Sequence, residues 1–341
     1  MGCCSISAST TEYGMMNDAK MAISEAAQLR QQIHHTRLGF NMMTQGKSML
    51  VAGPSGTGKS TFMRRALRSL GGGVIALAPG ADEMASYEEF ALGTQMARWS
   101  ASDDPAKQND RVHDALALPP RTDDKPYLMA TFADDDYLPS LQGSKAVAYA
   151  HRRYLRFLRA VAIVSEEAML QGAPLPYPVL VTDTLSAIGK MAFNAIMHDM
   201  RRSDAPPAMS PEGAAFYTGY RNKMEEVMTV QRRLRGLGMY VLASAHVTEK
   251  EVKQKELIGG VETPSVKQIL PMFTGQFRED VGAAFDLVLH SHVVKGACYL
   301  RWTPSMNRQS KSRVGALATD DKPMPNDFDD VMARVRAAKP L

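Results

Sequence analysis

Cysteine is scarce in this sequence of 341 residues. The three cysteines are Cys3, Cys4 and Cys298, and their spacing forms neither a disulfide framework nor a set of zinc ligands. We therefore expect a reducing, cytoplasmic environment. Long apolar runs are also missing, because none reaches the roughly 18 residues that a membrane-spanning helix needs, so no membrane partner is expected. The net charge of +4 permits nucleic acid as a partner without demanding it.

The remaining composition is that of an ordinary globular protein, with 45% hydrophobic and 22% charged residues. Short apolar runs that predict buried strands alternate with longer segments of helical periodicity. This alternation indicates an α/β fold with a mostly parallel twisted sheet and helices on both faces. The predicted strands are 48–52, 74–78, 127–132, 178–182, 239–243, 285–290 and 299–303, and the main predicted helices are 16–38, 61–70, 144–170 and 212–236.

Three regions follow from this pattern. Residues 1–44 comprise a disordered start and a helix, and residues 45–320 form the core. Within the core, an insertion at about 98–126 is rich in Asp, Ser, Pro and Lys. Residues 321–341 are expected to be a C-terminal helical tail.

A glycine-rich loop follows the first predicted strand of the core and precedes a helix. It reads Gly53-Pro54-Ser55-Gly56-Thr57-Gly58-Lys59-Ser60, with Thr61 extending its polar end. In such a loop, successive backbone N–H groups point at phosphate oxygens, and the helix N-terminus adds further donors. Lys59 would supply a positive charge to the β- and γ-phosphates, and the Ser60 hydroxyl would bind Mg²⁺. The sequence therefore predicts a nucleoside-triphosphate site.

Asp183 is the candidate for the acidic anchor that a Mg²⁺-dependent site needs on a neighbouring strand. It follows the apolar run Val179-Leu180-Val181-Thr182, so its carboxylate is expected at the carboxyl end of the sheet, where ligands of such folds bind. The alternative is that Asp183 caps the next helix.

Hydrolysis also needs a carboxylate that orients the attacking water. Two clusters are candidates: Asp82 and Glu83 after the second strand, and Asp134, Asp135 and Asp136 after the third. For each of these residues taken singly, a solvated loop charge is the favoured interpretation. The strand 239–243 continues into Ser244-Ala245-His246, where a polar side chain can contact the γ-phosphate. The alternative for His246 is a partly buried histidine whose ring nitrogens are hydrogen-bonded.

These motifs, together with Lys311-Ser312-Arg313-Val314-Gly315, resemble the RecA-type core ATPases over about residues 45–320. The likeness is greatest to RadA-like and phage RecA-like proteins, often called AAA-family ATPases of phages. It implies a RecA-like P-loop NTPase core that binds ATP and Mg²⁺. Glu83, with Asp82, stands where relatives carry the catalytic glutamate, and His246 stands at the sensor position. The spacing between Lys59 and Asp183 is longer than in the family.

The same resemblance implies that Lys311 and Arg313 are cations reaching the nucleotide of a neighbouring subunit, as an arginine finger does. An ordinary basic surface strand is the alternative. If Lys311 and Arg313 act on a neighbouring subunit, the protein must associate with copies of itself, as a ring or a filament. The family also implies single-stranded DNA as a possible partner, bound by loops at about 187–211 and 247–280. The Lys/Glu alternation at 249–256 is equally typical of an exposed helix.

Three functions remain open from the sequence. The first is an oligomeric ATPase acting on single-stranded DNA in phage-type recombination or replication, located in the host cytoplasm if phage-encoded. The second is a motor or switch ATPase acting on protein partners, such as a helicase loader or an assembly ATPase. The third is a small-molecule kinase in which Arg313 acts in cis.

Overall fold

The structure is a computed structural model of the chain. It describes residues 46–77, 85–97, 118, 122–123, 125–132, 144–200, 211–252, 266–274, 277–302, 311–312 and 322–337. All of them belong to one compact unit, Gly46–Leu341. The helix predicted within residues 16–38 lies outside the described residues.

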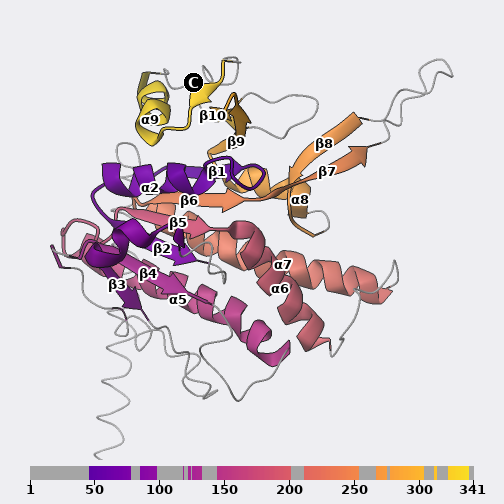
Figure 1. Cartoon of the computed structure of the whole chain (residues 1–341). Coiled ribbons are helices and arrows are strands. Elements are labelled where there is room, and N and C mark those ends of the chain that lie inside the picture. The colour runs from indigo at the N-terminus through magenta and orange to yellow at the C-terminus, as the bar shows by residue number, and fades with distance from the viewer. Residues whose placement is uncertain are drawn as a thin grey trace, which may run out of the picture. The chain divides into compact units, whose positions relative to one another are not determined.

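A single ten-stranded sheet organises this unit (Figure 1). Its strand order is β12-β10-β9-β1-β6-β5-β2-β4-β3, and β11 pairs with β9. The strands from β9 to β3 are parallel. At one edge, β10 and β11 each pair antiparallel with β9, and β12 pairs antiparallel with β10. The bounds are β1 Ser48–Ala52, β2 Gly73–Leu77, β3 Thr94–Ala97, β4 Tyr127–Thr131, β5 Val179–Asp183, β6 Tyr240–Ala245, β9 Leu287–Val294, β10 Ala297–Arg301, β11 Lys311–Ser312 and β12 Met324–Pro325.

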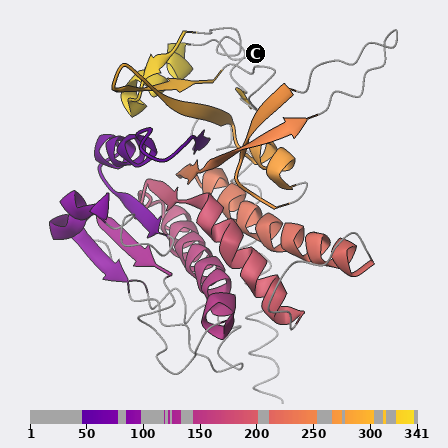
Figure 2. The same ribbon diagram turned by 45° about the vertical axis from the view of Figure 1, so that its right-hand side comes forward.

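Helices cover both faces of the sheet (Figures 1 and 2). One face carries α2 and α9, and the opposite face carries α5, α6 and α7. The helix bounds are α2 Lys59–Ser69, α5 Ser144–Leu170, α6 Leu185–Asp199, α7 Pro211–Gly236, α8 Phe277–Asp280 and α9 Phe328–Ala337, with short 3₁₀ turns η1 Glu88–Gly93 and η2 Val281–Ala284. None of these described helices combines the length and apolar character needed to cross a membrane.

The side-chain period of two along each strand divides the core between the two faces. In β1, Met49 and Val51 pack into the cluster beneath α2 and α9, while Leu50 packs into the cluster on the other face. All five residues of β1 are buried because neighbouring strands and helices enclose them. A strand buried on both faces reads as a continuous apolar run, which is why the sequence located it correctly.

The α/β class, with a mostly parallel sheet covered by helices on both faces, is confirmed by this topology. β1 lies between β6 and β9, and β6 separates it from β5, which ends in Asp183. The carboxyl ends of these parallel strands meet at one edge of the sheet. The glycine-rich phosphate loop (residues 53–60) and Asp183 therefore lie at the same edge, although they follow β1 and end β5, two strands that are not adjacent.

Two sequence expectations about the loops near this edge are wrong. Residues 187–211 were expected to form a loop, but α6 occupies Leu185–Asp199. An exposed helix was one interpretation of the Lys/Glu alternation at 249–256, but β7 (Val247–Val252) pairs with β8 (Val266–Pro271) in a two-stranded antiparallel sheet. β-Branched Val247, Thr248 and Val252 favour the extended conformation there. This hairpin projects from the body of the protein (Figures 1 and 2).

Candidate functional site

The glycine-rich loop connects β1 to α2 in a conformation that requires glycine. Gly56 and Gly58 have φ angles of 75° and 82°, in the left-handed region that other residues rarely adopt. α2 begins at Lys59 directly after Gly58, and no side chain caps this end of the helix. Its first backbone N–H groups are the donors that bind anions at helix N-termini.

The Lys59 side chain lies inside the loop and is only 6% exposed. Its ammonium group donates to the carbonyl oxygens of Gly53 at 3.0 Å and Pro54 at 2.7 Å. Burial lowers the pKa of Lys59 from its ordinary value, and the nearby Asp183 carboxylate opposes that shift. The loop thus holds a cation at its centre.

Asp183 ends β5 and is 1% exposed. Three hydroxyl groups donate to its carboxylate. Ser60 and Tyr87 each bind Oδ2 at 2.8 Å, and Ser244 at the end of β6 binds Oδ1. The alternative that Asp183 caps the following helix is excluded, because Thr184 is the N-cap residue of α6 and accepts from the Ala187 N–H at 3.1 Å.

The pairing of Ser60 with Asp183 fits a magnesium site. A hydroxyl and a carboxylate are hard oxygen donors, and Mg²⁺ takes only one or two protein ligands when nucleotide phosphates and water supply the others. Within the described residues no group of three or more His, Cys, Asp or Glu residues could hold a metal ion by itself. The metal-binding role of Ser60 and Asp183 stays a prediction.

Several predicted catalytic residues fall outside the described part of the chain. These are Asp82, Glu83, Asp134, Asp135, Asp136 and Arg313. Lys311 is described through its main chain, which pairs with Val288 in β9. Val288 pairs with Leu50, two residues before β1 ends at Ala52. Because β11 is antiparallel to β9, its main chain runs from Lys311 to Ser312 away from the phosphate loop.

His246 directly follows β6 and is half-buried. Its main-chain N–H donates to the Ser186 hydroxyl at 3.0 Å, which ties the end of β6 to the start of α6. The polar side chain of this segment that contacts Asp183 is Ser244, two residues earlier. The sensor role of His246 stays a prediction.

Three residues around the loop were not predicted as site residues: Tyr87, Ser291 and Asn326. The Ser291 hydroxyl lies 2.7 Å from the Thr57 hydroxyl. Asn326 binds the Gly58 carbonyl through its side-chain amide. Ser291 offered a weak signal, as a polar residue inside an apolar strand. Tyr87 and Asn326 lie in irregular segments that no local pattern distinguishes.

Tyr87 is fully buried beside Asp183. Burial raises its pKa well above the ordinary value of 10, and the Asp183 carboxylate raises it further. The phenol therefore stays protonated and donates its hydrogen to the carboxylate at any ordinary pH.

Comparison with known proteins places part of the chain in a recognised family. A family model described as an AAA domain matches residues 125–315, which is more than half of the chain. The matched region contains Asp183, Ser244 and His246 and begins after the phosphate loop. No curated protein matches the sequence.

Two solved structures are similar to this chain at low sequence identity. The flagellar accessory protein FlaH from Methanocaldococcus jannaschii is 9% identical, with 82% of this chain and 88% of that chain covered and a TM-score of 0.31. The genome packaging NTPase B204 from Sulfolobus turreted icosahedral virus 2, solved with ATP-gammaS, is 11% identical, with 86% and 88% covered and a TM-score of 0.28. Likenesses this remote carry no conclusion about activity.

Proposed function

The chain belongs to the AAA domain family, and we propose on that premise that it binds ATP with Mg²⁺ and hydrolyses the terminal phosphate. The observation that carries this proposal is the hydrogen bond of 2.8 Å from Ser60 to Asp183. This bond joins the start of α2 to the end of β5, a strand that is not adjacent to β1 in the sheet. A loop built only for structure would not need a buried carboxylate at this point.

In this proposal, the residues of the phosphate loop bind the phosphates of ATP and stabilise their negative charge. Backbone N–H groups at the start of α2 bind phosphate oxygens, and Lys59 neutralises charge on the β- and γ-phosphates. Asp183 accepts from Ser60 and so fixes the hydroxyl in place. Mg²⁺, when bound with the nucleotide, would neutralise charge that develops on the phosphates.

We assign the orientation of the attacking water to Glu83, with Asp82 as the second candidate, because relatives carry their catalytic glutamate at that place. His246 would report the loss of the γ-phosphate to the β7–β8 hairpin, since the hairpin begins at Val247. Ser186 supports this role, because it holds the His246 main chain against α6.

We further propose that the site is completed by a second subunit, in a ring or a filament. Lys311 and Arg313 are the proposed trans cations. The course of β11 favours a trans role over a cis role, because its main chain leads away from the chain's own phosphate loop. A small-molecule kinase with Arg313 acting in cis is disfavoured for the same reason.

The proposed substrate is single-stranded DNA, in phage-type recombination or replication. Support comes from the family resemblance and from the projecting β7–β8 hairpin, whose strands contain Lys250 and Lys267 (Figures 1 and 2). The backbone register places Glu251 opposite Lys267, so the charge of the described strands is balanced. A motor or switch acting on a protein partner is the alternative function.

Phosphate release measured with Mg²⁺, with excess EDTA and with single-stranded DNA at low salt tests these proposals. We expect hydrolysis that requires Mg²⁺ and that increases with DNA. Absence of any hydrolysis, with or without DNA, would contradict the ATPase assignment. Hydrolysis that is unchanged by DNA, together with no DNA binding at low salt, would favour the protein-partner alternative.

A further inference from the structure

The C-terminal segment 324–337 is fixed beside the phosphate loop although it lies more than 260 residues away in the sequence. β12 pairs with β10, and the Asn326 N–H then donates to the Cys298 carbonyl at 3.1 Å. Asp327 caps α9 by accepting from the N–H of Asp329 at 2.9 Å. The main chain of Asn326 is therefore held between a strand end and a helix start.

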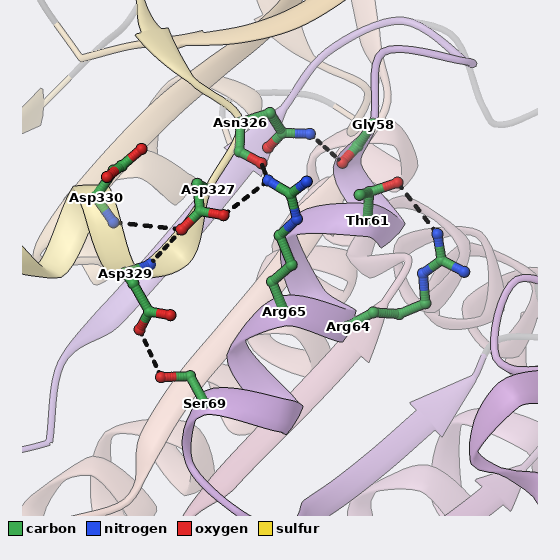
Figure 3. A network of polar contacts seen from close by, with 9 residues as sticks. All are labelled: Gly58, Thr61, Arg64, Arg65, Ser69, Asn326, Asp327, Asp329 and Asp330. Atoms are coloured by element: carbon green, nitrogen blue, oxygen red, sulfur yellow. Dashed lines mark hydrogen bonds and ion pairs between the residues drawn. The ribbon is translucent and has the colours of Figure 1, made fainter.

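The Asn326 side chain contacts the loop itself (Figure 3). Its amide nitrogen Nδ2 donates to the Gly58 carbonyl at 2.6 Å, and the residue is only 5% exposed. The fit is tight, because a Cβ atom on Gly58 would lie 2.3 Å from that nitrogen and 3.0 Å from the Cys298 sulfur. The loop and the C-terminal segment thus meet in close contact without space for a methyl group.

The bond to Gly58 acts on the peptide unit that begins α2. The Gly58 carbonyl also accepts from the Phe62 N–H at 3.0 Å, so two donors fix its direction. A trans peptide is planar and its N–H points opposite to its C=O. Holding the Gly58 carbonyl therefore sets the direction of the Lys59 N–H, one of the helix donors available to a phosphate.

Further contacts hold α9 against α2 (Figure 3). Arg65 donates to the Asn326 carbonyl at 2.6 Å and to Asp327 at 2.8 Å, and Ser69 donates to Asp329 at 2.5 Å. Beneath them, the rings of Phe62 and Phe328 pack edge to face with centroids 5.7 Å apart. These contacts place the C-terminal segment on the same helix that starts at the phosphate loop.

We propose that residues 324–337 form a clamp on the phosphate loop and that Asn326 is a positioning residue for triphosphate binding. The clamp acts through the Gly58 carbonyl, which presets the Lys59 N–H for phosphate before nucleotide arrives. This inference rests on the proposed function, because the loop must bind a nucleotide for the clamp to matter. It adds a residue from the far end of the chain to the binding site.

The Asn326→Ala variant separates positioning from packing. Alanine removes the donor and places no atom against the Gly58 carbonyl. It also removes the buried acceptor Oδ1, which takes no hydrogen bond from any described residue. The Gly58 carbonyl keeps the Phe62 N–H as a donor, so the substitution leaves that acceptor paired. Ser69→Ala is the matched control, because it removes one contact between α2 and α9 but leaves the contact between Asn326 and Gly58 in place.

Hydrogen exchange of the nucleotide-free full chain tests the clamp without relying on activity. We expect the amides at 56–62 to exchange about fivefold faster in Asn326→Ala than in the wild type, as loss of one net hydrogen bond implies. The Ser69→Ala variant should match the wild type in this segment. Unchanged exchange at 56–62 in Asn326→Ala would overturn the proposal.

Calorimetric titration with a non-hydrolysable ATP analogue and Mg²⁺ completes the test. We expect about fivefold to tenfold weaker binding for Asn326→Ala and wild-type affinity for Ser69→Ala. Faster exchange with unchanged affinity would refute a positioning role. If the wild type binds no analogue while its loop amides still depend on Asn326, the clamp stands and the proposed ATPase function fails.

Discussion

Tyr87 and Ser60 donate to the same oxygen of Asp183, each at 2.8 Å. One donor comes from the phosphate-loop helix and the other from the segment after β2, so the carboxylate ties two separate parts of the site together. Ser244 binds the other carboxylate oxygen. The shared contact leads to specific expectations for Asp183 and Tyr87.

Lys59→Ala should weaken triphosphate binding by between about 10-fold and 150-fold, the range expected for hydrogen bonds to charged groups. Titration with a non-hydrolysable ATP analogue measures this loss. The exposed Lys295, in the turn between β9 and β10, provides the control variant Lys295→Ala, for which we expect wild-type affinity. Tight binding by the Lys59 variant would refute the site assignment.

Asp183→Asn should reduce hydrolysis by between about 10-fold and 100-fold, as is common for residues that orient a metal ligand. Asparagine keeps the shape and one acceptor oxygen but lacks the negative charge. The Mg²⁺ concentration that gives half the maximal rate should also rise, which rates measured over a series of Mg²⁺ concentrations would show. A variant with the wild-type rate and Mg²⁺ dependence would remove Asp183 from the metal site.

Tyr87→Phe removes one hydroxyl from Asp183 and leaves the buried ring in place. We expect hydrolysis to fall by about twofold to tenfold, the value of one ordinary hydrogen bond, while analogue binding changes little. Tyr127→Phe is the control, because that half-buried ring packs on Phe90 and its hydroxyl does not bind Asp183. Equal rates for the two variants would show that the Tyr87 hydroxyl has no part in turnover.

His151 should make the protein sensitive to acid. Burial and the positive charge of Lys223 together lower its pKa from 6.5 to about 4. The unfolded chain takes up this proton below about pH 6.5, whereas the folded chain resists until about pH 4. Stability is therefore complete above pH 6.5 and falls by roughly 3 kcal/mol as the pH decreases to 4.

Urea unfolding at pH 7.5, 5.5 and 4.5 measures this loss. The His151→Gln variant, which cannot titrate, should lose correspondingly less stability over the same range. An identical pH dependence in the wild type and the variant would exclude His151 as the source.

Arg313→Ala should preserve analogue binding but suppress turnover, because a trans cation acts chiefly in the transition state. Mixing this variant with Lys59→Ala protein should restore part of the hydrolysis, since some interfaces then combine an intact loop with an intact Arg313. Phosphate release across a series of mixing ratios gives the measurement. No recovery at any ratio would contradict the trans assignment.

The elements that local patterns determine were predictable from the sequence. β1, β5 and α5 are marked by continuous apolar runs or by a long helical period, and their bounds agree with the structure within one residue. The glycine-rich loop was also recognisable, because its spacing is dictated by the phosphate it must surround. These features depend on residues close together in the chain.

The missed contacts depend on tertiary structure instead. Tyr87 reaches Asp183 across 96 residues and Asn326 reaches Gly58 across 268 residues, so no local period could indicate either. The hairpin β7–β8 was misjudged for a different reason. Its Lys/Glu alternation suits an exposed strand as well as an exposed helix, and only pairing with β8 decides between them.

The position of β1 within the sheet also affects how the protein is made. Leu50 pairs with Ala243, which leaves the ribosome 193 residues later, and its other neighbour Val288 follows later still. At 5–20 residues per second, this apolar strand emerges about 10 to 40 s before its first partner exists. Such non-local parallel pairing is slow to form and prone to aggregation. The nascent chain is thus an expected client of chaperones that shield exposed apolar segments during translation.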